Sequence, residues 1–402
     1  MDKIKNTMKI IKTNRGIEVK VYAETFENEA YEQVERLANY EAYADSKIRI
    51  MPDSHAGKGC TVGTTITITD KVTPNLVGVD IGCGMLTIEL NDKFIDCAKL
   101  DDIIRSKVPN GFNVHDRQKE TFNFDNLICA KHVNLERALL SIGSLGGGNH
   151  FIEMDYSKKT GKYYLVIHTG SRKLGGDVCK YYQNIAFIEL NKAKKNKYDL
   201  INKLKLEGRT KEINSELKNI VDITVNNELA HLYGDNFNNY LNDMYIVQQF
   251  AILNRKTIAD IIINEMGFSE SFRFETIHNY IDFKRMILRK GAVSAEFGER
   301  LLIPINMRDG SLICIGKGNE DWNFSAPHGA GRLMSRSKAK KNISIDDFES
   351  SMVGIFTTSV SRATIDEAPQ AYKSIEEISL AIKDTVEIVD IIKPIYNFKT
   401  ND

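Results

Sequence analysis

Hydrophobic and polar residues alternate along several stretches of this chain, and the alternation predicts β-strands separated by glycine-rich turns. Between residues 60 and 90, Val62, Ile66 and Ile68 alternate with threonines, and MLTIEL repeats the pattern after a turn that contains three glycines. This turn reads VGVDIGCGM at residues 77–85. We therefore expect it to be a tight, specified connection that joins two strands.

The same pattern of strands and glycine turns occurs at two further places before residue 178. SLGGGNHFIEM reads as a glycine loop that leads into a strand, and YYLVIHTGSRKLGG reads as a buried strand that ends in a second glycine loop. From residue 272 the pattern returns in FETIHNYIDF, RKGAVSAEFGE and NFSAPHGAGR. These segments predict a substantial amount of β-sheet on both sides of the central part of the chain.

The central residues 178–266 have a different, helical pattern. Apolar residues recur there at helical spacing, as in Tyr240, Met244, Val247, Ala251 and Ile258. The segment KLKLEGRTKEINSELKN is highly charged and predicts a solvated helical hairpin. Because the glycine motifs flank this block on both sides, we expect an α+β fold with a single catalytic domain over residues 1–402, in which residues 178–266 form a helical elaboration.

Composition narrows the class of protein. A chain of 402 residues with 42% hydrophobic content can bury a large core. Its 54 basic and 54 acidic residues balance, so no net charge attracts the chain to nucleic acid or to a membrane. No apolar run approaches the length of a membrane span, so we expect a cytoplasmic protein. The six cysteines lack paired spacing, which predicts reduced thiols that are available as ligands.

Histidines carry the candidate chemistry. Four of the eight lie beside glycine or asparagine at predicted strand ends, namely His150, His168, His278 and His328. With Asp80 and Cys83 they form the ligand types that bind a borderline divalent metal such as Mn, Zn or Fe, and a thiolate can bridge two ions. A lone histidine beside an apolar strand is more often a hydrogen-bonded structural residue. The set taken together favours a metal site.

The remaining motifs indicate phosphate binding. The two glycine loops offer consecutive backbone N–H groups near Asn149, Ser171 and Arg172, as in an anion nest. In PHGAGRLMSRSKAKK a basic run that begins with Arg332 follows His328, and arginine suits bidentate phosphate recognition. The alternative for the KAKK run is an ordinary solvated face, and the alternative for a single glycine loop is a simple turn.

In chain order, the motifs VGVDIGCGM, GSLGGGNHFIE, HTGSR, HNY and SAPHGAGR resemble those of the RtcB family of GTP-dependent RNA ligases. This family joins RNA 3′-phosphate or 2′,3′-cyclic phosphate ends to 5′-hydroxyl ends. MPDSHAGKG at residues 51–59 and the terminal IIKPIYNFKT also fit, so the resemblance runs from about residue 50 to the end. It implies the family's own mixed α+β fold, with β-sheets that form a central metal cleft.

The resemblance also implies a role for each matching residue. The ligands of paired Mn²⁺ ions would be Asp80, Cys83, His150, His168 and His278. His328 would be the nucleophile that carries GMP, with Asp53 near the metals and His55 behind the ligands. Contacts to the guanine nucleotide would come from Asn149, Glu153, Asn306, Ser311, Gly329, Ala330, Gly331 and Lys399. Arg172 and Arg332 would hold RNA phosphates, and archease is a candidate activating partner.

One departure from the family pattern concerns the nucleotide pocket. Residues 304–308 read PINMR where the family usually has PGSMG, so Asn306 stands in place of a nucleotide-contacting serine and the loop should be stiffer and bulkier. This difference points to a divergent bacterial paralogue that acts in RNA repair or in tRNA splicing. Two alternatives remain open: a dinuclear metal phosphodiesterase or cyclic phosphate hydrolase without guanylylation, and a non-catalytic RNA-binding paralogue.

Overall fold

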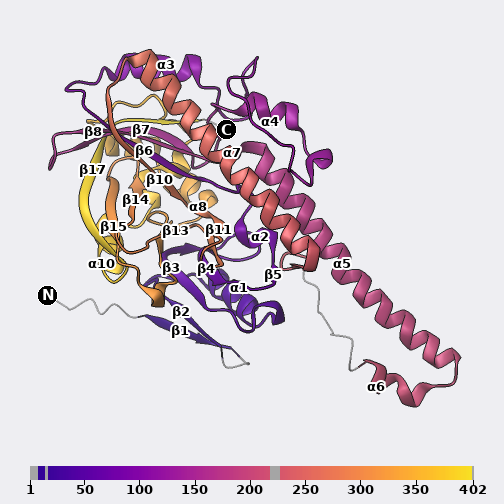
Figure 1. Cartoon of the computed structure of the whole chain (residues 1–402). Helices are drawn as coiled ribbons and strands as arrows, with labels where there is room; N and C mark the ends of the chain where they lie inside the picture. Colours follow the sequence, from indigo (N-terminus) through magenta and orange to yellow (C-terminus); the bar gives the residue numbers. More distant parts are fainter. Residues whose placement is uncertain (1–7, 14–16, 218–226, 401–402) are drawn as a thin grey trace.

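Two large β-sheets and a pair of long helices make up the architecture, which is the expected α+β fold (Figure 1). The computed structural model describes residues 8–13, 17–217 and 227–400. The smaller of the two large sheets has six strands in the order β1-β2-β3-β4-β12-β11, and β2 and β3 are its one parallel pair among the described residues. Its strands are β1 Lys9–Lys12, β2 Glu18–Val21, β3 Ile48–His55, β4 Val62–Thr67, β11 Asn279–Asp282 and β12 Ile287–Lys290.

The second sheet has seven strands in the order β10-β6-β8-β7-β17-β15-β14, and every neighbouring pair is antiparallel. Its strands are β6 Gly84–Leu90, β7 Phe151–Ser157, β8 Tyr163–Thr169, β10 Glu270–Ile277, β14 Arg300–Asn306, β15 Gly310–Gly316 and β17 Val386–Lys399. The sheet curls until its two edges meet, because Thr276 Oγ1 on β10 accepts a hydrogen bond of 3.1 Å from the backbone N–H of Leu302 on β14.

The antiparallel register brings one set of strand ends together. Cys83 immediately precedes β6, His150 immediately precedes β7, and His278 immediately follows β10. β8 ends just after His168, and β17 ends at Lys399. Because neighbouring strands alternate in direction, the starts of β6 and β7 lie at the same end of the sheet as the ends of β8, β10 and β17.

Two long helices, α5 Arg172–Leu206 and α7 Gly234–Met266, lie side by side. One of them, α5, projects beyond the body with α6 Ile213–Leu217 at its tip (Figure 1). The five apolar residues that predicted the helical period in α7 are all fully buried, which confirms that prediction. The charged segment near residue 207 turns back through η3 Thr210–Glu212 and α6 Ile213–Leu217, and its last two residues lie outside the described part of the chain.

Shorter elements complete the fold. The remaining helices are α1 Asn28–Ala38, α2 Pro74–Val77, α3 Cys97–Lys107, α4 Leu135–Ser141, α8 Arg336–Asn342, α9 Ile345–Ser351 and α10 Ile375–Ala381. Five further 3₁₀ turns in the described residues are η1 Glu41–Tyr43, η2 Ala130–His132, η4 Glu320–Trp322, η5 Ile365–Glu367 and η6 Pro369–Ala371. Two small sheets pair β5 Lys71–Val72 with β9 Leu232–Tyr233, and β13 Ala292–Ser294 with β16 Ser325–Pro327.

The structure corrects two local predictions. The VGVDIGCGM turn follows helix α2 rather than a strand, because Pro74 occupies the first turn of that helix, where its missing N–H costs nothing. The expected second glycine loop is instead the first turn of α5. A side chain at Gly175 would lie 2.1 Å from Ser171 Oγ, so the glycine is needed where the helix passes close to the preceding loop.

Arg255 on α7 ties this helix to the ligand-bearing strand ends. Its guanidinium is completely buried and donates hydrogen bonds of 2.8 Å to the carbonyls of Gly82 and Thr169, which are the neighbours of Cys83 and His168. The same side chain pairs with Glu275 Oε2 on β10 at 2.8 Å. One buried arginine therefore fixes three segments that carry or adjoin candidate ligands.

We expect Arg255→Met to reduce the free energy of unfolding by about 3 kcal/mol, because it leaves a carboxylate and two buried carbonyls without their donor. Urea denaturation measures this change. Arg273→Met is the matched control, since Arg273 pairs with Glu270 at the partly exposed edge of the same strand and should cost no more than about 1 kcal/mol. Equal losses in the two variants would contradict the role given to Arg255.

Candidate functional site

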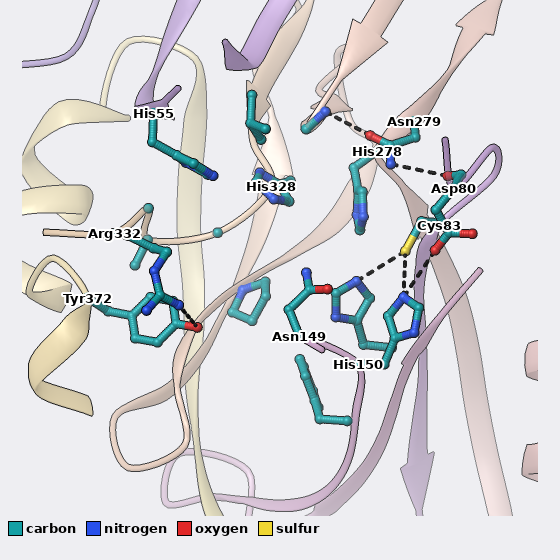
Figure 2. Close-up of a pocket in the computed structure, with 18 of the residues that line it drawn as sticks. His55, Asp80, Cys83, Asn149, His150, His278, Asn279, His328, Arg332 and Tyr372 are labelled. Carbon is teal, nitrogen blue, oxygen red and sulfur yellow. Dashed lines mark hydrogen bonds and ion pairs between the residues drawn. The ribbon is translucent and has the colours of Figure 1, made fainter. Parts of the chain in front are cut away.

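The strand ends bring a thiol and two imidazoles into direct contact. Cys83 Sγ lies 3.3 Å from His150 Nε2 and 3.4 Å from His168 Nε2. The three side chains are buried, and their donor atoms all lie within 4.8 Å of one another (Figure 2). These separations match the edges of a coordination polyhedron, because metal–sulfur and metal–nitrogen bonds of about 2.0–2.3 Å place neighbouring ligand atoms at such spacings.

Asp80 lies beside this cluster and is held in place by the loop that follows β8. Its Oδ2 is 3.1 Å from His150 Nε2, and its Oδ1 accepts a hydrogen bond of 2.9 Å from the backbone N–H of Ser171. A side chain at Gly170 would come within 2.2 Å of this carboxylate, so only glycine fits there. Burial alone would raise the pKa of Asp80, but the hydrogen bond and charge of His150 outweigh it and hold the pKa at about 2.

The donor set fits a divalent metal ion. Burial, reinforced by the charge of Asp80, raises the pKa of the Cys83 thiol well above its ordinary value, while burial lowers the pKa of His168 well below the usual range. His168 is therefore neutral and ready to donate a lone pair. A cation would stabilise the thiolate that this buried position otherwise disfavours.

His278 extends the cluster toward a fourth imidazole. Its ring centroid lies 5.1 Å from that of His168 and 4.9 Å from that of His328. Its backbone N–H donates to the carbonyl of Cys83 at 2.9 Å, which fixes the two strand ends to each other. Burial lowers the pKa of His278 well below its ordinary value, so this ring is neutral as well.

His328 is oriented by a buried carboxylate. Its Nδ1 lies 2.6 Å from Asp53 Oδ2, which also accepts hydrogen bonds from the backbone N–H groups of His328 and Gly329 at 3.1 and 3.2 Å. Asp53 had been expected near the metal ligands, and the structure shows that its contact is with the nucleophile candidate. His55 lies alongside, with its Nδ1 3.2 Å from the Asp53 carbonyl, and burial lowers the pKa of His55 to about 4.

One cavity of about 390 Å³ connects these groups. In Figure 2 His328 lies between the group formed by Asp80, Cys83 and His150 and the pair formed by Arg332 and Tyr372. The cavity is lined by all five predicted metal ligands and by His328. The other predicted residues that line it are Asn149, Glu153, Asn306, Gly329, Ala330, Gly331, Arg332 and Lys399.

The end of the cavity away from the thiol is rich in paired charges. Lys399 Nζ lies 2.8 Å from Glu367 Oε2, and the Tyr372 hydroxyl donates to the same oxygen at 2.7 Å. Burial raises the pKa of Glu153 to about 7, with the charge of Lys399 acting in the opposite direction. This end therefore offers a buried carboxylate and an ammonium group side by side, which suits a ligand that carries both donors and acceptors.

Three predicted residues have surroundings that their proposed roles did not anticipate. Ser311 is fully buried in β15 and is not among the residues that line the cavity. The side-chain oxygen Oδ1 of Asn306 accepts hydrogen bonds from the backbone N–H groups of Arg308 and Asp309. The side chain therefore stabilises the turn that follows it. Arg172 donates hydrogen bonds to Ser144 Oγ at 3.0 Å and to the Gly111 carbonyl. Its guanidinium therefore joins the glycine loop that precedes His150 to the loop around Gly111.

Sequence reasoning missed several residues that shape the site. Asn279 donates to the Asp80 carbonyl at 3.1 Å and accepts from the Gly291 N–H at 2.9 Å, and it thereby joins the metal-ligand loop to the strand near His328. It lies inside the HNY motif, which could have indicated it. Glu367 and Tyr372 occur in a segment without glycine or strand pattern, so no comparable signal indicated them.

Comparisons with known proteins identify the family of this chain. A family model described as tRNA-splicing ligase RtcB matches residues 33–134 and 126–400. RNA-splicing ligase RtcB of Escherichia coli is 28% identical over 390 residues, which cover 87% of this chain and 88% of that protein. The tRNA-splicing ligase RtcB of Aeropyrum pernix is 26% identical, with 82% of each chain covered. The chain belongs to the RtcB family.

Proposed function

We propose that this protein is a GTP- and Mn²⁺-dependent RNA ligase that joins RNA 3′-phosphate or 2′,3′-cyclic phosphate ends to 5′-hydroxyl ends. The observation that carries the proposal is the pairing of His328 with Asp53 beside the thiol–imidazole cluster, inside a single cavity. Family membership supports it, since the relatives in that family bear the names of RNA-splicing and tRNA-splicing ligases. These names favour RNA splicing as the setting, and RNA repair is the other setting that we propose.

The Asp53 contact supports Nε2 of His328 as the nucleophilic atom in this proposal. A carboxylate at 2.6 Å accepts a hydrogen bond only from a protonated Nδ1, so the neutral ring keeps its lone pair on Nε2. In the proposed reaction Nε2 attacks the α-phosphorus of GTP, a P–N bond forms, and pyrophosphate departs with the electrons of the broken P–O bond. Asp53 then stabilises the positive charge that develops on the ring.

The metal ligands in this proposal are Asp80, Cys83, His150, His168 and His278. When bound there, divalent cations supply charge neutralisation for the triphosphate. The chain's own contribution is to hold these largely buried donors close together. Asp80 is fixed by Ser171, Cys83 by the contacts of its loop with His278, and the strand ends by Arg255.

The guanine would bind at the opposite end of the cavity. Glu153 can accept hydrogen bonds from the two neighbouring donors on the guanine edge when it is ionised, and Lys399 stabilises that ionised form. Asn149 and the loop of Gly329, Ala330 and Gly331 would contact the phosphate. GMP then passes from His328 to the RNA 3′-phosphate, and the 5′-hydroxyl displaces it to form the phosphodiester bond.

His328→Ala should abolish covalent labelling of the protein by α-labelled GTP in the presence of Mn²⁺, because His328 is the residue proposed to form the phosphoramidate. The label should be acid-labile and alkali-stable, as a P–N bond is, and gel autoradiography detects it. His132→Ala is the control, since His132 is an exposed histidine stacked on Tyr181 and should label normally. If the wild-type protein takes no label from GTP but hydrolyses a 2′,3′-cyclic phosphate end, the result would favour the phosphodiesterase alternative.

Asp53→Asn should slow the same labelling reaction by about 10²-fold or more, because an amide can no longer select the Nδ1-protonated ring or stabilise its charge. Rates of single-turnover labelling at saturating GTP give the comparison. Asp45→Asn removes a carboxylate from an exposed position and serves as the control. A rate within about twofold of wild type would remove Asp53 from the mechanism.

Binding of Co²⁺ as a spectroscopic probe should produce a thiolate-to-cobalt charge-transfer band, and Cys83→Ser should eliminate it while Cys97→Ser retains it. The reason is that Cys83 is the thiol within contact distance of the imidazoles, whereas Cys97 is half-buried beside the carbonyls of Ile95 and Ile395. Absorption spectra recorded during a Co²⁺ titration measure this directly. A band that survives in Cys83→Ser would show that the metal binds elsewhere.

A further inference from the structure

The loop from Pro109 to His115 is fixed against the glycine loop of the site. The carbonyl of Pro109 accepts a hydrogen bond of 2.8 Å from the Leu145 N–H, and His115 Nε2 lies 3.0 Å from the Gly143 carbonyl. Asn110 also accepts from the Thr400 hydroxyl at 2.8 Å. The loop therefore has a defined position beside the glycine loop that precedes His150, although it contains no helix or strand.

Arg172 connects this loop to the metal-ligand cluster. Its Nη2 donates to the Gly111 carbonyl and its Nε donates to Ser144 Oγ. A side chain placed at Gly146 would lie 2.0 Å from His150 Nδ1 and 2.8 Å from Arg172 Nη1, so the guanidinium and the ligand ring flank the same glycine. Arg172 adopts φ of 55°, a left-handed conformation that costs a non-glycine residue energy and is typical of functional positions.

Phe112 projects from this fixed loop into solvent. Its side chain is 85% exposed, although its own carbonyl accepts a hydrogen bond of 2.7 Å from Arg137 and the preceding carbonyl is held by Arg172. Two arginine side chains therefore hydrogen-bond to the consecutive carbonyls of Gly111 and Phe112, which flank the exposed phenyl ring along the backbone. A rigidly mounted aromatic ring between cationic groups is the arrangement that binds single-stranded RNA, through base stacking and phosphate contacts.

We propose that Phe112 is a stacking platform for a nucleobase of single-stranded RNA near the end that enters the site, with Arg137 and Arg172 attracting the adjacent phosphates. This inference rests on the proposed function, which brings RNA ends to the cavity, and adds a contact for the base. Because every base has an aromatic face, the contact would favour unpaired ends without reading their sequence. A duplex end would offer fewer accessible faces and should bind less well.

The test is the affinity of the full-length protein for a single-stranded oligoribonucleotide that ends in a 3′-phosphate and carries 2-aminopurine at its terminal positions. Phe112→Leu should weaken binding about fivefold or more and remove the fluorescence quenching that stacking causes. Phe112→Tyr retains the ring and should bind as wild type does. Phe94→Leu is the matched control, because Phe94 is 77% exposed and should show no change.

Each outcome decides the inference. Equal affinity and equal quenching for wild type and Phe112→Leu would overturn it. The exposed ring would then be a candidate contact for a protein partner instead of RNA. Absence of RNA binding by the wild-type protein would also overturn it. Failure of the proposed function is a separate result, since it would appear as a wild-type protein that takes no label from GTP, whereas the comparison of RNA affinities needs no nucleotide.

Discussion

The constraint on which the site depends is the crowding of a thiol and neutral imidazoles at one buried end of an antiparallel sheet. Cys83 and His150 immediately precede β6 and β7, and His168 lies on β8 between these two strands, so the register of the three strands sets how closely the side chains approach. Burial disfavours a thiolate there, and a cation bound at this position would stabilise it. Arg255 and Asn279 tie the surrounding loops to this end of the sheet and keep the donors converged.

The nucleophile candidate belongs to a different part of the fold. His328 follows β16 and is oriented by Asp53 on β3 of the six-stranded sheet, whereas the thiol cluster belongs to the seven-stranded sheet. His278 bridges the two, with ring contacts to His168 on one side and to His328 on the other. The site therefore requires both sheets at a fixed separation, which is consistent with a functional unit built from most of the chain.

The sequence predicted the strands around the glycine motifs and the helical period of α7, because both depend on local periodicity. It also identified many of the residues that line the cavity, since their motifs resemble a known family. It could not indicate that Asp53 binds His328 or that Arg255 holds the ligand loops, because these contacts join residues that are far apart along the chain and lack a local pattern. Glu367 and Tyr372 were missed for the same reason. The first turn of α5 was assigned to a loop because glycines usually break helices, and here they allow close packing.

The departure at residues 304–308 bears on how the nucleotide would be recognised. Asn306 uses its side chain to close its own turn, and Arg308 pairs with Asp309 at the surface, so this loop is committed to internal contacts. In the proposed function, recognition of guanine then depends more heavily on Glu153 and Lys399. Lys399 is shared, because it also pairs with Glu367, whose pKa is held at about 2 by Lys399 and Arg336 against the effect of burial. Glu367 stays ionised near neutral pH and holds Lys399 in an ion pair, and the charge of Lys399 opposes the rise that burial causes in the pKa of Glu153, which favours the ionised form needed for the proposed guanine contact.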